Sequence, residues 1–158
     1  RPVPYQDILF KEYIKITGDE LSMRKFLGLT LNSSWGSIRC KIIGNHTALT
    51  LKLGGHVLDY LLDTGASYLT IDDEHADEMI LSGQAVDLHE NLQLEIANGE
   101  LVDARKILIK RIVVEDVVVE NVTAVSTRNN PKLLGMSFLN KFRSWKISED
   151  GGWLRYKR

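Results

Sequence analysis

A single carboxylate in this chain lies where proteins seldom place one. Asp63 follows the mostly apolar run 58–62 and precedes Thr64 and Gly65. The run favours burial, an ionised carboxylate favours water, and glycine permits backbone angles that most residues avoid. Proteins keep such an arrangement mainly where the carboxylate takes part in chemistry. Asp63 is therefore the candidate catalytic residue, of a type suited to transferring a proton or activating a water molecule.

The residues before Asp63 predict a rigid support for it. Residues 47–53 alternate apolar and polar side chains, which is typical of a half-buried strand. Gly54 and Gly55 indicate a hairpin turn, and residues 56–62 are expected to form the returning strand. A tight hairpin that ends at Asp63 would hold the carboxylate in a fixed position, as catalysis requires.

A second motif, Leu-Leu-Gly at 133–135, follows about seventy residues later. Together with Asp-Thr-Gly at 63–65, it resembles the hydrophobic-hydrophobic-glycine and active-site motifs of retropepsin-like aspartic proteases. The run Leu-Leu-Gly-Met-Ser-Phe-Leu at 133–139 is similar to the small bacterial members of that family. The resemblance covers residues 45–158. It implies an all-β, retropepsin-like acid protease fold, a closed barrel-like domain with one short C-terminal helix.

The resemblance implies an aspartic endopeptidase, whose chemistry needs two facing carboxylates. The chain has one Asp-Thr-Gly and no second Asp-Thr-Gly or Asp-Ser-Gly. A homodimer is therefore expected, in which each chain contributes Asp63 across a two-fold axis. Two carboxylates about 3 Å apart share a proton, so the ionised one activates water and the protonated one polarises the scissile carbonyl. The expected partner is a peptide or protein substrate, and no metal or other cofactor is required.

The resemblance also implies roles for other residues. The expected supporting residues of the active site are Thr64, Gly65, Leu133, Leu134 and Gly135. The expected substrate-binding residues are Ala66, Ser67, Ala97, Asn98 and Gly99. In the family, the threonine hydrogen-bonds across the dimer axis, the apolar-apolar-glycine motif packs beneath the catalytic loop, and a flap hairpin closes over the peptide. Asn-Gly at 98–99 is a strong hairpin signal at a suitable place for that flap, which would bind peptide by strand addition.

Ala66 stands where pepsin-like enzymes have a serine. A hydroxyl group at that place would stabilise the ionised carboxylate. Its absence predicts a weakly acidic to near-neutral pH optimum for cleavage.

Several further elements are expected from local patterns. Thr70 or Asp72 could cap a helix that runs to about residue 82 and stops at Gly83, because acidic residues at 72–74 suit a helix N-terminus. Alternating or β-branched runs predict strands at 92–96, 101–114, 117–119, 122–125, 145–147 and 153–156, and one helical stretch is expected at 136–142. By the same resemblance, the terminal hairpin with Trp145 and Trp153 is expected near the dimer interface.

Residues 1–44 differ from the rest and are expected to form an N-terminal extension, with the protease domain at 45–158. Apolar side chains between residues 5 and 16 recur at helical spacing. Three alternatives stay open for this segment: packing on the protease body, blocking the cleft as a regulatory segment, or linking to a membrane anchor.

Composition excludes several classes of function. The net charge is −1, and the few basic pairs lack an aromatic-rich basic strand, so nucleic-acid binding is not expected. No apolar run approaches the roughly twenty residues of a membrane-spanning helix. No membrane contact by this segment is expected. The favoured location is a bacterial periplasm or the soluble domain of a membrane-anchored protein, with the cytoplasm left open.

The cysteine and the histidines give no indication of a disulfide or a metal site. Cys40 is the one cysteine, so no intrachain disulfide can form, and a buried or interface position is expected for it. The histidines at 46, 56, 75 and 89 lack the spacing of a zinc site and are expected on the surface.

A non-catalytic protein-binding or dimerisation module on the same fold is the alternative function. A fold alone does not determine activity, so this alternative stays open at the level of sequence.

Overall fold

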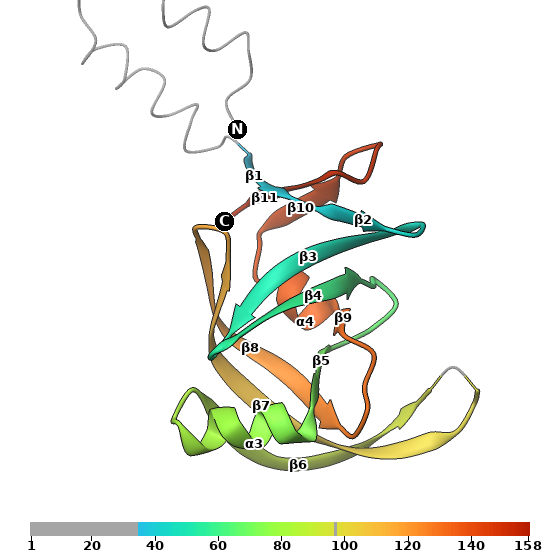
Figure 1. Ribbon diagram of the computed structural model, residues 1–158, viewed down its shortest axis with the longest axis vertical. Coiled ribbons are helices and arrows are strands. Elements are labelled where there is room, and N and C mark those ends of the chain that lie inside the picture. Colours follow the sequence, from blue (N-terminus) through green and yellow to red (C-terminus); the bar gives the residue numbers. More distant parts are fainter. Residues whose placement is uncertain (1–34, 97) are drawn as a thin grey trace, which may run out of the picture.

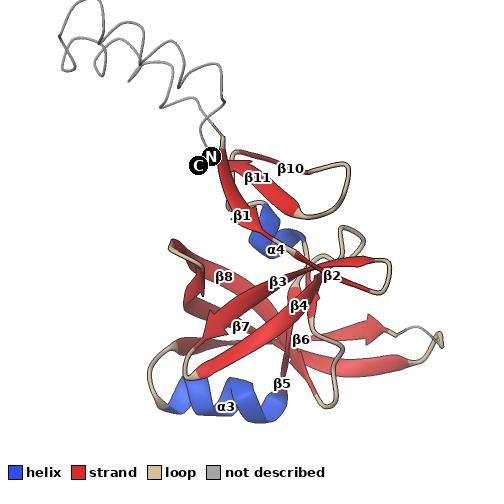
Figure 2. Cartoon of the chain, turned by 45° about the horizontal axis from the view of Figure 1, so that its top comes forward, coloured by secondary structure: helices blue, strands red, loops and turns tan. Residues whose placement is uncertain are grey.

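The computed structural model describes residues 35–96 and 98–158. The expected helix within residues 5–16 and Ala97 of the expected flap lie outside these ranges. The described chain forms two β-sheets and two helices (Figure 1). Figure 2 shows the smaller sheet and helix α4 at one end of the molecule and helix α3 at the other. In the described residues, no helix has both the length and the apolar character needed to cross a membrane.

The larger sheet begins with the hairpin that the sequence predicts. Strand β3 (His46–Leu53) pairs with strand β4 (His56–Leu62), and Leu53 lies opposite His56. Gly54 in the turn has a φ of 59°, a left-handed conformation that glycine adopts without strain. Leu49, Leu51 and Leu53 are fully buried, so the alternating pattern of β3 directs one face into the core.

Three long strands, joined in sequence, make up much of this sheet. They are β6 (Ala85–Glu95), β7 (Leu101–Val114) and β8 (Val117–Thr127). The sequence predicts two strands where β8 runs as one. Asn121, at a φ of 56°, accounts for the apparent break, because its left-handed conformation interrupts the ladder without shifting the register on either side.

Two short parallel strands were not foreseen. β5 (Leu69–Asp72) pairs with β8, and β9 (Leu133–Leu134) pairs with β4. The strand order is β5-β8-β7-β3-β4-β9, with β2 (Lys41–Ile43) paired to β3 and β6 paired to β7. The all-β expectation is confirmed, although the sheet ends at β5 and β9 and is not closed into a barrel.

The smaller sheet has the order β1-β11-β10, and its strands are β1 (Gly36–Arg39), β10 (Ser144–Ile147) and β11 (Trp153–Lys157). The terminal hairpin is therefore present as expected. β1 and β2 fall within residues 1–44, yet both pair with strands of the folded body. A truncation at residue 44 would remove two strands as well as the extension.

The helices correspond to the expected ones, with different ends. Helix α3 (Asp73–Leu81) follows Asp72, but the Asp72 side chain does not cap it. That carboxylate accepts a hydrogen bond from the Asn130 amide at 3.0 Å instead, and Thr70 lies in β5. Helix α4 (Met136–Leu139) is a single turn, shorter than the predicted 136–142.

The expectation of a surface position is wrong for His75. Its side chain is buried on α3, and its Nε2–H donates to the Leu53 carbonyl oxygen at 3.1 Å. The His56 ring lies 4.2 Å from it, centroid to centroid, and Glu78 binds the far nitrogen of His56 at 2.8 Å. Burial lowers the pKa of His75 below 6.5, and the nearby His56 acts in the same direction. Cys40 is buried, as expected, and burial raises its pKa to about 11.

The lowered pKa of His75 predicts acid sensitivity of the fold. Between its folded pKa and 6.5, the unfolded chain binds more protons at this site, so this contribution to stability is present above about pH 6.5 and is lost as the pH falls. Urea unfolding of His75→Gln between pH 5 and 8 should show a smaller loss of stability on acidification. His46→Gln, at an exposed site, is the matched control. An unchanged slope in His75→Gln would contradict the prediction.

Candidate active site

Asp63 begins a tight turn immediately after β4. Its carbonyl oxygen accepts the Ala66 amide at 3.1 Å, and its Oδ1 accepts the Gly65 amide at 2.9 Å. Its own amide donates to the Leu134 carbonyl oxygen at 3.0 Å. The side chain is half-buried. Both the backbone and the carboxylate of Asp63 are thus held by hydrogen bonds within the described chain.

The Leu-Leu-Gly segment lies directly against this turn. Leu133 and Leu134 pair with the last two residues of β4, in parallel. The Met136 amide then donates to the Ala66 carbonyl oxygen at 2.8 Å, and the Ser137 amide donates to that of Ser67 at 2.9 Å. Two segments about seventy residues apart in sequence therefore hydrogen-bond through their backbones on both sides of the glycine.

Gly135 is required by this close approach. A Cβ atom at Gly135 would lie 2.4 Å from the Tyr68 carbonyl oxygen and 2.6 Å from that of Ala66. Both neighbours are backbone atoms, so a side chain could be admitted only if the turn after Asp63 moved. We refer to the backbone contacts of residues 133–137 with residues 63–69 as the clasp.

A cleft of about 870 Å³ opens beside Asp63. One wall is the turn at 63–68, the second is the β6–β7 hairpin, and the third is the segment 127–131 between β8 and β9. Its apolar lining consists of Ala66, Leu92, Leu94, Ile96, Val102, Val125, Pro131 and Leu133. Its ionisable lining residues include Asp63, Glu95 and Arg128. A mostly apolar groove with few charged groups suits an extended peptide.

The β6–β7 hairpin extends away from the rest of the sheet (Figure 1). At its tip, the Ile96 amide donates to the Glu100 carbonyl oxygen at 2.9 Å, and the Gly99 amide donates to Ile96 at 2.8 Å. Asn98 Oδ1 accepts the Glu100 amide at 2.9 Å. The expected hairpin at Asn-Gly is therefore present, and its tip forms an ordered turn around Gly99, which has a φ of 82°.

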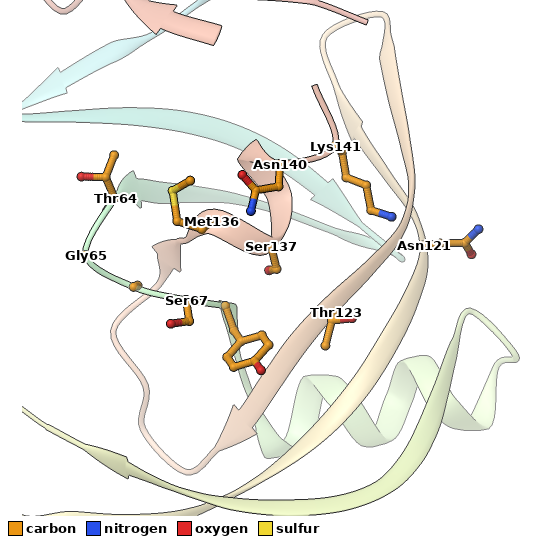
Figure 3. A pocket seen from close by; sticks show the side chains of 11 residues that line it. Thr64, Gly65, Ser67, Asn121, Thr123, Met136, Ser137, Asn140 and Lys141 are labelled. Atoms are coloured by element: carbon orange, nitrogen blue, oxygen red, sulfur yellow. The ribbon is translucent and has the colours of Figure 1, made fainter. Parts of the chain in front are cut away.

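A second hollow, of about 450 Å³, also borders the turn after Asp63. Figure 3 shows Thr64, Gly65 and Ser67 along it, with Met136, Ser137 and Asn140 from the region of α4 and Thr123 from β8. Residues 65–68 line both hollows. The polar residues Asn121, Thr123, Asn140 and Lys141 were not anticipated there, because nothing in their local pattern indicates the approach of α4 to β8.

The structure brings most of the expected site residues together. Asp63, Gly65, Ala66, Ser67, Asn98 and Leu133 all line the cleft. Thr64 is exposed beside the second hollow, and Gly99 lies at the hairpin tip outside the cleft lining. Leu134 and Gly135 are buried beneath the turn. Among the described residues, no three His, Cys, Asp or Glu side chains gather as metal ligands would.

Sequence reasoning missed two contributors to the cleft, Thr70 and the segment 127–131. Thr70 is buried, its hydroxyl donates to the Pro131 carbonyl oxygen at 2.6 Å, and its oxygen accepts the Leu133 amide at 2.9 Å. Its position before an acidic stretch suggested a helix cap. The actual partners lie about sixty residues away along the chain, so no local signal could identify them.

Gly135→Ala should disrupt the clasp. The added methyl group overlaps backbone oxygens, so we expect a loss of about 2 kcal/mol or more in the free energy of unfolding. Gly55→Ala is the matched control, because a Cβ atom there meets nothing within 4 Å. Urea denaturation of both variants measures the difference. Equal stability of the two variants would show that the turn accommodates a side chain at 135.

The fold and the motifs agree with known proteins. A family model for aspartyl proteases matches residues 49–138, a range that includes both the Asp-Thr-Gly and the Leu-Leu-Gly segments. Among solved structures, the crystal structure of a retropepsin-like aspartic protease from Rickettsia conorii has a similar fold, with a TM-score of 0.52. The two chains are 22% identical, and the match covers 77% of this chain and 90% of the other. No curated protein matched the chain. The chain belongs to the aspartyl protease family and has a retropepsin-like fold.

Proposed function

We propose that this protein is an aspartic endopeptidase that acts as a homodimer, with one Asp63 from each chain at the catalytic centre. The observation that carries the proposal is the position of Asp63. Its carboxylate is held by the Gly65 amide at 2.9 Å, at the wall of a peptide-sized, mostly apolar cleft. The proposed protease domain comprises residues 45–158 together with β1 and β2, which complete its sheets.

The proposed mechanism needs only the two carboxylates and water. At close range the two groups share one proton, because both cannot be ionised together. The ionised carboxylate takes a proton from the water molecule between them, and the protonated one donates a hydrogen bond to the scissile carbonyl. Water then attacks the carbonyl carbon directly. The resulting tetrahedral intermediate collapses with protonation of the leaving amine, and no acyl-enzyme forms.

The need for a second chain follows from the carboxylates that line the cleft. Among the described residues, Asp63 and Glu95 are the carboxylates that line it, and Glu95 lies at the end of β6, on the hairpin. Asp63, by contrast, lies beside the exposed Thr64 and Gly65, which a second copy could approach. A two-fold axis at this point would bring the two Asp63 side chains face to face.

An Asp63→Asn variant tests the shared centre. We expect it to lose cleavage while remaining folded and dimeric, because it removes the ionised group without a change in size. When it is mixed with an equal amount of wild-type protein and allowed to exchange, wild-type dimers should fall to roughly one quarter of the total. If mixed dimers are inactive, the specific activity per wild-type chain should fall by about half. Peptide cleavage after exchange measures this.

Asp59→Asn is the matched control, since it makes the same change four residues earlier, in β4, where the carboxylate accepts hydrogen bonds from Thr50 and Lys41 on the surface. It should cleave as the wild type does. Full activity per wild-type chain in the Asp63→Asn mixture would contradict the shared centre. Loss of cleavage in Glu95→Gln, with the dimer intact, would point instead to a pair of carboxylates within one chain.

The shared proton also predicts the shape of the pH profile. A pair of carboxylates that holds one proton gives a bell-shaped dependence of kcat/KM on pH. With alanine at position 66, the maximum is expected at weakly acidic to near-neutral pH. Initial rates on one peptide between pH 3 and 8 measure the profile. A maximum found only in strong acid would contradict the expectation.

A further inference from the structure

Arg128 is a cationic residue of the Asp63 cleft to which the proposed mechanism assigns no role. It lies in the segment 127–131 and lines the same cleft as Asp63. It is the only Lys, Arg or His among the described residues that line this cleft. The other lining groups that carry charge are the carboxylates of Asp63 and Glu95. An acidic peptide side chain would therefore meet repulsion in this cleft except near Arg128.

The backbone that carries Arg128 is fixed on both sides. Before it, Thr127 is buried and paired with Asp72 in the β5–β8 ladder. After it, the Asn130 amide donates to Asp72 Oδ1 at 3.0 Å, and the Asn130 side-chain amide donates to the Ile71 carbonyl oxygen at 3.1 Å. Between these anchors, Asn129 has a φ of 54°, in the left-handed region. The segment is held to β5 as a fixed loop, and its shape places Arg128 at the cleft.

The Arg128 side chain has no interaction partner within the described part of the chain. It is exposed and forms no hydrogen bond, ion pair or ring contact with residues 35–96 or 98–158. By contrast, Arg105 is bound by Asp77 and lies near Asp73 and Asp87. Glu95 lines the same cleft but does not pair with Arg128. A guanidinium group held at a cleft wall with all its donors available is suited to a bidentate contact with a carboxylate.

We propose that Arg128 determines substrate specificity by binding an acidic side chain of the peptide close to the scissile bond. The inference rests on the proposed function, because it concerns the peptide bound in the Asp63 cleft. In a two-fold dimer the cleft contains two copies of Arg128, related by the same axis as the two Asp63 carboxylates. Acidic residues are therefore favoured on either side of the cleaved bond.

Matched peptides test this directly. One series of peptides, capped at both ends so that terminal charges are absent, carries Asp or Glu in turn at each position around the scissile bond. A second series carries Asn or Gln at the same positions. For wild-type protein, kcat/KM should be about tenfold higher for the acidic member at one or more positions, as a charge-assisted hydrogen bond in a partly open site provides. The preference should weaken as salt is raised.

Variants at two positions separate a specific contact from general charge. Arg128→Gln should lower the ratio of kcat/KM for acidic over amide peptides from about ten to about one. Arg128→Glu should shift the preference toward Lys. Lys132→Gln is the matched control, because Lys132 is an exposed cation four residues later that does not line the cleft. Its side chain has no ion-pair or hydrogen-bond partner among the described residues. This control should keep the wild-type preference.

Binding to Asp63→Asn protein makes the result independent of catalysis. Fluorescence anisotropy of the same capped peptides should show tighter binding of the acidic series. This preference should be lost in the double variant that carries both Asp63→Asn and Arg128→Gln. An acidic preference in binding without any cleavage by wild-type protein would reject the proposed endopeptidase and keep the role of Arg128. Three outcomes would overturn the role of Arg128. The protein could cleave and bind acidic and amide peptides equally, it could bind neither series, or Lys132→Gln could lose the preference as fully as Arg128→Gln.

Discussion

The backbone contact between the turn at 63–66 and the segment 133–137 is the constraint on which the rest of the site depends. A carboxylate at the end of a strand would be free to move unless the turn after it were held from outside. Here the Leu134 carbonyl and the Met136 amide bind the turn on both sides of Gly135. The contact is possible because that glycine leaves no Cβ atom against two carbonyl oxygens. A preorganised carboxylate and a glycine far away in sequence are thus one structural feature.

The clasp also determines what the rest of the cleft can do. Because β9 pairs with β4, the chain that leaves β8 passes along the Asp63 cleft, which residues 127–131 line, before it reaches β4. That return segment is held to β5 through Thr70 and Asn130. It therefore forms a fixed wall opposite the hairpin, and it carries Arg128. Under the proposed role of Arg128, the same path that supports Asp63 also supplies the group that distinguishes acidic peptides from others.

Much of this arrangement was predictable because it depends on local patterns. The β3–β4 hairpin, β7, the Asn-Gly turn and the terminal hairpin were expected from alternation and turn residues, and the structure contains them. The two motif segments were recognised by their residue types. The missed features depend on contacts distant in sequence. β5 and β9 are too short to show a period, and Thr70 binds Pro131 rather than a helix. His75 is buried and donates a hydrogen bond to the Leu53 carbonyl oxygen, a contact that no local pattern indicates. Arg128 carries no sequence signal of its own, since only the fold brings it to the cleft.

The central claim is that Asp63 becomes catalytic when a second copy supplies its partner. Specific activity measured over a series of protein dilutions tests it most directly, with the fraction of dimer determined by analytical ultracentrifugation at the same concentrations. The account predicts that cleavage per chain falls in parallel with the dimer fraction and approaches zero for the monomer. Constant specific activity across the range in which the protein becomes monomeric would contradict it.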